Sequence, residues 1–303
     1  MENKIEIFSE RKIKKTRDKI TLKKDQDNIL FNKVNQRLSE RLLLIKKNNF
    51  KICELGSRTG LTMKSIPKEK KVKKFFFTDI SHQILVNAKE KIIYDDSIQN
   101  KAFINLNNES LPFKERFFDL VLSNLYLHWS NNFSVCLNEI NRVLKPDGLF
   151  LASLFGNETL QELKYSLYKA EDKLTNTVTP RVSPFPNMQQ IGSLLQTAGF
   201  NLPVIDKDTI KILYKDLTHL MYDIKSMGES NSLMERKQSF TPARIFDAAG
   251  KIYKKEFSRG NKIYATFEIL YLIGWKKHKS QQKPKEPGSA RKDLSEFLSK
   301  KIN

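Results

Sequence analysis

The feature that most constrains the fold is a glycine turn between an apolar strand and a helical stretch. The run that starts at Phe50 leads into Glu54-Leu55-Gly56-Ser57-Arg58-Thr59-Gly60, where Gly60 opens the predicted helix. Gly56 permits a tight turn and a close backbone approach, and Glu54 at the strand end can accept a hydrogen bond from an amine. Taken alone, the same pattern also fits simple turn glycines.

A second acidic position favours a cofactor site over that simpler interpretation. Phe75-Phe76-Phe77-Thr78 is typical of a buried parallel strand and ends at Asp79, 23 residues after Gly56. A carboxylate at this strand end can bind two ribose hydroxyls. The two turns therefore predict one cofactor crevice, with the following candidate residues: Glu54, Gly56, Ser57, Arg58, Gly60, Asp79 and Ile80.

Strands and helices alternate along the first half of the chain. After these two strands, the patterns predict a helix over 81–91, strands over 102–106, 118–123 and 149–154, and a helix over 131–144, all preceded by an amphipathic helix within 26–46. This order predicts an α/β fold with a mostly parallel, doubly wound sheet and helices on both faces. Helices over 160–174, 188–198, 216–227 and 242–256 and strands over 205–213 and 263–275 predict a helical insertion after strand five and a seven-stranded sheet.

Three asparagines are placed to reach the same crevice. Asn107 and Asn108 follow the third strand, where an amide can hydrogen-bond an adenine edge, and Asn124 follows the fourth. For each of them a surface-loop role remains equally compatible, because asparagine is common in turns.

Composition separates three parts of the chain. We expect a basic N-terminal segment (1–25), one domain (26–275) with a cofactor half (50–155) and a substrate or cap half (156–275), and a basic tail (276–303).

The net charge is +20, from 54 Lys and Arg against 34 Asp and Glu. The excess is spread over the chain, which favours a compositional origin over specific nucleic-acid binding. The tail still leaves peripheral contact with an anionic membrane open.

Targeting and redox signals favour the cytoplasm. The N-terminus mixes acids with Lys and Arg and lacks an apolar core segment, unlike a signal peptide. Cys53 and Cys136 are the two cysteines, which gives neither a disulfide framework nor metal-ligand spacing. We expect a cytoplasmic protein without a metal site.

The motifs together carry a family resemblance. The chain resembles the class I S-adenosylmethionine-dependent methyltransferases related to the biotin-pathway malonyl-carrier-protein methyltransferase, on these segments: Glu54 to Gly60, Asp79, Leu111-Pro112-Phe113, Phe118-Asp119-Leu120-Val121, Leu127-His128-Trp129 and Leu144-Lys145-Pro146-Asp147-Gly148. The resemblance implies a Rossmann-like methyltransferase fold and S-adenosylmethionine as the cofactor.

Motifs of the second half resemble a narrower group, the mitochondrial complex I assembly factors that act as arginine hydroxylases. They are Ser153 to Leu160, Ser183-Pro184-Phe185, Met227-Gly228-Glu229-Ser230-Asn231, Tyr264 to Ile269 and Gly274-Trp275-Lys276. This resemblance runs from about Ile7 to Ala290 and implies a protein substrate, an arginine of a complex I subunit.

One position departs from the family pattern. The family loop reads acid-x-Gly-x-Gly-x-Gly, and Arg58 stands at its middle glycine. The side chain would either crowd the cofactor or pair with its methionine carboxylate.

Catalytic candidates are few. His128 is the nearest candidate base, with a structural role as the alternative, and Glu229 would address a guanidinium or cap a helix. The candidate substrate residues are Trp129, Ser183, Phe185, Ser230 and Asn231.

Three functions remain open. The first is an S-adenosylmethionine-dependent enzyme that modifies a protein arginine in complex I assembly. The second is a methyltransferase for a carrier-protein thioester or another small acid. The third is a non-catalytic assembly factor. Nothing in composition or spacing separates methylation from hydroxylation, which would need an oxidant or a metal whose ligands the sequence does not reveal.

Overall fold

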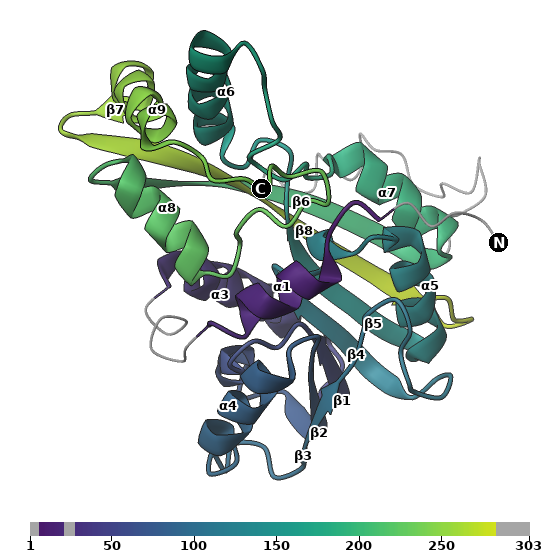
Figure 1. Cartoon of the computed structure of the whole chain (residues 1–303). Coiled ribbons are helices and arrows are strands. Elements are labelled where there is room, and N and C mark those ends of the chain that lie inside the picture. The colour runs from purple at the N-terminus through teal and green to yellow at the C-terminus, as the bar shows by residue number, and fades with distance from the viewer. Residues whose placement is uncertain (1–5, 21–27, 283–303) are drawn as a thin grey trace, which may run out of the picture.

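One mixed sheet organises the chain in the computed structural model, which describes residues 6–20 and 28–282 (Figure 1). Its long strands run in the order β3-β2-β1-β4-β5-β8-β6, and the two-residue β7 pairs with β8. The first five strands in this order pair in parallel, whereas β8 is antiparallel to both of its neighbours. The expected mostly parallel, Rossmann-like α/β sheet is confirmed.

The strands are β1 (Asn49–Leu55), β2 (Lys71–Asp79), β3 (Lys101–Asn105), β4 (Phe118–Asn124), β5 (Leu144–Phe155), β6 (Phe200–Tyr214), β7 (Ser258–Arg259) and β8 (Lys262–Lys276). The α-helices are α1 (Glu10–Arg17), α3 (Ile29–Leu43), α4 (His82–Ile92), α5 (Phe133–Val143), α6 (Gln161–Thr175), α7 (Met188–Thr197), α8 (Leu217–Ser226) and α9 (Ala243–Glu256). Two short 3-10 helices are η1 (Leu61–Ser65) and η2 (Leu127–Trp129).

Alternating strand residues bury two cores, one on each face of the sheet. In β1, Ile52 belongs to the core that includes residues of α3, α4 and α6, while Cys53 and Leu55 belong to the core that includes residues of α5 and α7. Because side chains alternate across a strand, a single sequence run supplies both cores. The sheet is therefore covered on both faces, and its polar strand ends are left to form a site.

Three local expectations need correction. The stretch after Gly60 is the five-residue 3-10 helix η1 and not an α-helix, and Pro67 follows shortly after it. The segment 146–148, which the sequence leaves as a turn between the predicted helix over 131–144 and the predicted strand over 149–154, is part of β5, and β5 has a register shift against β4 here. Strand β6 is longer than expected because it pairs with β8 almost along its whole length.

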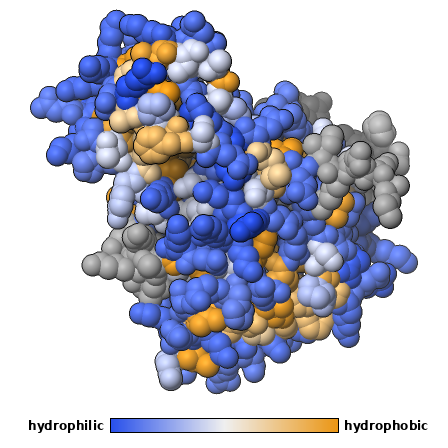
Figure 2. All heavy atoms as spheres, in the orientation of Figure 1, coloured by the Kyte–Doolittle hydropathy of each residue, from blue (hydrophilic) through white to orange (hydrophobic). Residues whose placement is uncertain are grey.

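The inserted helices α6, α8 and α9 lie at one end of the sheet (Figure 1). Arg181, in the loop after α6, forms an ion pair with Glu171 of that helix and donates to Thr241 Oγ1 before α9. Most of the face seen in Figure 2 is hydrophilic, with apolar residues in small groups. Among the described residues, every helix is too short or too polar to cross a bilayer.

The Leu111-Pro112-Phe113 segment is fastened by an ion pair on α5, which makes its stability pH-dependent. Arg142 binds Glu139 (Nε to Oε1, 2.7 Å) and donates to the carbonyls of Leu111 and Phe113 at 2.9 and 2.7 Å. The hydrogen bonds that Arg142 donates to the Glu139 carboxylate hold the pKa of Glu139 below its ordinary value of 4.5. The ionised Glu139 therefore contributes its full stabilisation of the folded state above about pH 4.5. This contribution is lost as the pH falls through the lowered pKa of Glu139 in the folded state.

We expect Glu139→Gln to lower the free energy of unfolding at neutral pH by up to about 1 kcal/mol, because the pair is partly exposed. Urea unfolding of parent and variant from pH 7 to pH 3 measures the difference, which should shrink toward the acid end. A difference that stays constant over this range would contradict the assignment.

Candidate cofactor crevice and adjoining acidic site

The predicted cofactor residues gather at the carboxyl ends of β1, β2 and β4. Glu54 is buried in β1, and Asp79 ends β2 with 1% of its surface exposed. The neighbouring Ser57 joins the two strands, because its N–H donates to Thr78 O and its Oγ accepts from Thr78 N, both at 2.8 Å. The strand-end turns thus meet at one crevice, as expected for a doubly wound sheet.

Both loop glycines have left-handed backbone, and a Cβ at either position would meet a neighbouring side chain. Gly56 has φ +72°, and a Cβ there would lie 2.1 Å from the ring of Tyr126. Gly60 has φ +77°, and a Cβ there would lie 1.9 Å from Ile92. Left-handed backbone and close packing together explain why glycine stands at each.

Arg58 also has left-handed backbone, with φ 52°. This accounts for the family's glycine at the position, since a side chain adds strain there. The buried guanidinium stacks on Phe31 at 3.9 Å from the ring centroid and donates to Met227 O at 2.7 Å. Its Nη1 lies 4.0 Å from Glu229 Oε1. The side chain therefore ties the loop to α3 and to the segment after α8.

The three asparagines have different surroundings. Asn107 donates to Glu10 Oε1 at 2.8 Å, whereas Asn108 is buried and donates to Cys136 Sγ at 3.4 Å. Asn124, the last residue of β4, donates to Asn35 Oδ1 at 2.6 Å and accepts from Ser153 Oγ at 2.9 Å. Ile80 is half-buried and lines a small cavity beside Asn107 and Asn108.

The crevice is filled by two residues that sequence reasoning missed, Arg17 of α1 and Tyr126. Arg17 is 1% exposed and binds Asp79 through Nε to Oδ1 at 2.9 Å and Nη2 to Oδ2 at 2.5 Å. Burial lowers the pKa of this guanidinium, but the Asp79 charge and hydrogen bonds raise it above its ordinary value. Arg17 also lies over the Tyr126 ring at 4.6 Å.

The cavities beside the predicted cofactor residues are too small for a nucleoside cofactor. In the described part of the chain, one cavity of about 10 Å³ lies beside Arg58 and Asn124, and another of about 10 Å³ lies beside Ile80 and Asn107. Such a volume is comparable to the room needed for one water molecule, whereas ligand sites typically measure about 300–1,000 Å³. Neither of these two cavities therefore has room for S-adenosylmethionine.

An acidic site adjoins the crevice and brings together both catalytic candidates. Glu229, whose side chain is 7% exposed, accepts from Trp129 Nε1 at 3.0 Å, and its Oε2 lies 3.0 Å from His128 Nε2. Among the described residues, neither Glu229 Oε1 nor His128 Nδ1 has a hydrogen-bond partner. One carboxylate oxygen is thus held by two aromatic side chains, and the other faces the Arg58 guanidinium.

The other substrate candidates lie around this site. Phe185 packs against His128 and Phe155, with ring centroids 5.6 and 5.5 Å apart. Asn231 donates to Pro180 O at 2.8 Å and so joins the two loops, while the Ser230 carbonyl accepts from Ser232 Oγ. Ser183 lies between two residues that line a separate cavity.

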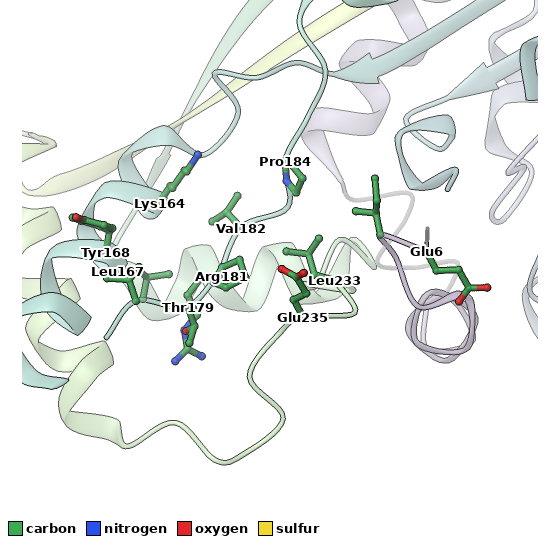
Figure 3. A pocket seen from close by; sticks show the side chains of 13 residues that line it. Glu6, Lys164, Leu167, Tyr168, Thr179, Arg181, Val182, Pro184, Leu233 and Glu235 are labelled. Atoms are coloured by element: carbon green, nitrogen blue, oxygen red, sulfur yellow. The ribbon is translucent and has the colours of Figure 1, made fainter. Parts of the chain in front are cut away.

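That cavity has a volume of about 600 Å³ and lies between α6, the proline-containing loop, the segment after Glu229 and the N-terminal segment (Figure 3). Its lining is largely apolar, with charged residues among it: Glu6, Ile7, Lys164, Leu167, Tyr168, Val178, Thr179, Pro180, Arg181, Val182, Pro184, Leu233 and Glu235. In the part of the chain that is described, no group of three or more His, Cys, Asp and Glu is placed to hold a metal ion.

The missed residues carried only weak sequence signals. Ser9 caps α1 by accepting from Lys12 N, and two apolar side chains are buried, Ile13 in the helix and Ile20 after it. With six Lys and Arg between residues 11 and 19, the segment has the composition of a solvated helix. A serine cap followed by spaced isoleucines was the one available indication of a packed helix.

Comparisons with known proteins identify the family to which the chain is similar. Residues 53–152 match the family described as a methyltransferase domain. The chain is 37% identical over 269 residues to the mitochondrial arginine-hydroxylase NDUFAF5 of Homo sapiens, covering 88% of this chain and 76% of that protein. It is 30% identical over 252 residues to the malonyl-[acyl-carrier protein] O-methyltransferase of Xylella fastidiosa (strain M23), covering 83% and 82%.

The solved structure of YcgJ from Bacillus subtilis shares the fold, with a TM-score of 0.57, 15% identity and coverage of 82% of this chain and 99% of that one. The chain spans 64% of the length of the Dictyostelium discoideum arginine hydroxylase, which it also matches.

Proposed function

Because this chain belongs to the family of class I S-adenosylmethionine-dependent methyltransferases that includes the NDUFAF5 arginine hydroxylases, we propose that it modifies an arginine of a protein substrate. The cofactor that we propose is S-adenosylmethionine, bound among the strand-end residues around Asp79 after the crevice opens. The substrate that we propose is a subunit of respiratory complex I, on the basis of the family resemblance. We further propose that the protein acts in the cytoplasm, with at most peripheral membrane contact and no specific nucleic-acid partner.

The observation that carries this proposal is the buried carboxylate of Glu229. Its Oε2 is held by Trp129 and lies beside His128, and its Oε1 lies 4.0 Å from the guanidinium of Arg58. A fixed, partly desolvated carboxylate is the group that recognises a guanidinium most strongly. The Arg58 contact supports the view that a guanidinium can approach this oxygen, and we assign Glu229 to substrate arginine recognition.

Intact-mass analysis tests the proposal. The complex I subunit is produced with and without this protein, and the expected change is about +16 Da for one added oxygen or about +14 Da for one methyl group. Fragment spectra should place the added mass on an arginine. An unmodified subunit in both samples would remove the proposal.

A second candidate is O-methylation of a malonyl-carrier-protein thioester, which the similarity to the Xylella fastidiosa enzyme supports. Rescue of growth without biotin in a strain that lacks that enzyme would favour this candidate. A non-catalytic assembly role predicts a different result. Calorimetry would then show no heat with S-adenosylmethionine, for the parent and for Asp79→Ala alike.

A further inference from the structure

The segment Ile7–Ile20, here called the N-terminal strap, makes polar contacts with three predicted cofactor residues. Arg17 binds Asp79 through two nitrogens and also donates to Gly56 O at 3.3 Å. Glu10, at the opposite end of α1 from Arg17, accepts from Asn107 Nδ2 at 2.8 Å. The strap therefore engages groups at both strand-end turns of the crevice and at the loop after β3.

Asp79 has no acceptor capacity left when the strap is in place. Its Oδ1 accepts from Arg17 Nε at 2.9 Å and from Ser81 N at 3.0 Å. Its Oδ2 accepts from Arg17 Nη2 at 2.5 Å and from Arg58 N at 3.2 Å. Two carboxylate oxygens offer about four lone-pair positions, and all of them are used. Two ribose hydroxyls can bind this carboxylate only if Arg17 leaves it.

The strap also contacts the segment that carries Glu229. Met234 N donates to Ile7 O at 2.9 Å and Ser9 N donates to Ser232 O at 2.8 Å, which pins the start of the strap to that segment. At the other end Ile20 packs against Gly228, where a Cβ would come within 2.7 Å of it. The strap thus bridges the crevice and the acidic site, so its displacement would uncover both.

We propose that the N-terminal strap is an internal occupant of the cofactor crevice, and that strap docking and binding of S-adenosylmethionine or S-adenosylhomocysteine exclude each other. The Arg17–Asp79 pair holds the closed state, and cofactor binding releases the strap from the Glu229 segment as well. The cofactor's identity rests on the proposed function, whereas the closure itself rests on the contacts above. When only an open fraction of molecules is competent, the apparent dissociation constant is raised by the inverse of that fraction.

Calorimetry with S-adenosylhomocysteine on three full-length proteins tests the exclusion. Arg17→Met removes the charge but keeps a long side chain, and we expect it to bind at least about tenfold more tightly than the parent. Arg11→Met is the matched control, because Arg11 is exposed on the same helix. It should bind like the parent. Equal or weaker binding by Arg17→Met would overturn the inference, since Arg17 would then not oppose the cofactor. Undetectable binding in all three proteins would overturn it too.

A second measurement needs no variant. Trypsin cleaves after Lys and Arg, and the strap contains six such sites between residues 11 and 19. Saturating S-adenosylhomocysteine should accelerate cleavage within the strap of the parent protein. Protection of these sites by the ligand would overturn the inference, because the strap would then close over the cofactor. Neither experiment uses an acceptor. A protein that releases its strap but leaves the complex I subunit unmodified would lose the proposed function and keep this inference.

Discussion

Replacing Asp79 by alanine is expected to lower the free energy of unfolding by about 3–5 kcal/mol, because it leaves the Arg17 guanidinium buried without a counter-ion. The side chains of this pair are 1% and 0% exposed, so water cannot compensate for the lost partner. The backbone N–H groups of Arg58 and Ser81 lose an acceptor as well. Urea unfolding at neutral pH, followed by circular dichroism, measures the change as a shift of the midpoint.

A double variant separates the ion pair from the space that it fills. Arg17→Met together with Asp79→Ala removes both charges, and replacing a buried ion pair by apolar groups is often nearly neutral. We therefore expect the double variant to be more stable than Asp79→Ala alone, with a favourable coupling energy in the cycle. A double variant that loses the sum of both single effects would show that the pair does not act as a unit.

The sheet could be predicted because its signals are local. Each strand of the cofactor half is a short apolar run that ends in a glycine, acid or amide, and the intervening helices begin at Ser81 and Asn132, whose side chains cap them. Gly60 has left-handed backbone, and the segment after it forms a short 3-10 helix instead of a long α-helix. The sequence leaves 146–148 outside the predicted fifth strand, because pairing with a neighbouring strand, and not local residue preference, decides whether such a segment joins a strand.

The contents of the crevice could not be predicted in the same way. Arg17 lies 62 residues before Asp79 in the chain, and its burial depends on that distant carboxylate and not on its own basic neighbours. Tyr126 lies beside Leu127-His128-Trp129, a motif that the sequence did single out, yet its contact with Gly56 is tertiary. The sequence therefore predicted which groups line the strand ends, but not that the chain itself supplies an arginine to one of them.

The residues of the acidic site could be predicted from sequence, but their contacts could not. His128, Trp129 and Glu229 were each proposed from sequence, and the structure places them within hydrogen-bond distance across about 100 positions of chain. Periodicity gave no reason to expect these contacts. A second carboxylate oxygen without a hydrogen-bond partner in the described residues is visible only in three dimensions.

Replacing Glu229 by glutamine is expected to lower kcat/KM for the arginine-bearing protein substrate about 100-fold. Glutamine keeps an oxygen for the Trp129 N–H but removes the charge that a guanidinium requires, and a charge-assisted bond of this kind contributes about 3 kcal/mol. A tenfold change in rate corresponds to about 1.4 kcal/mol, which gives the predicted factor. Initial rates of modification, followed by mass spectrometry over a range of substrate concentrations, measure it.

Two controls separate a loss of substrate recognition in Glu229→Gln from damage to the fold or to the cofactor site. Glu256→Gln removes an equal charge at the exposed end of α9 and should leave both kcat/KM and stability unchanged. Binding of S-adenosylhomocysteine to Glu229→Gln should also remain at the parent level, because among the described residues the hydrogen-bond partners of the Glu229 carboxylate are Trp129 and His128, and neither is a predicted cofactor residue. An equal loss of S-adenosylhomocysteine affinity and of rate would assign Glu229 to the cofactor. An unchanged rate would show that the substrate arginine is recognised elsewhere.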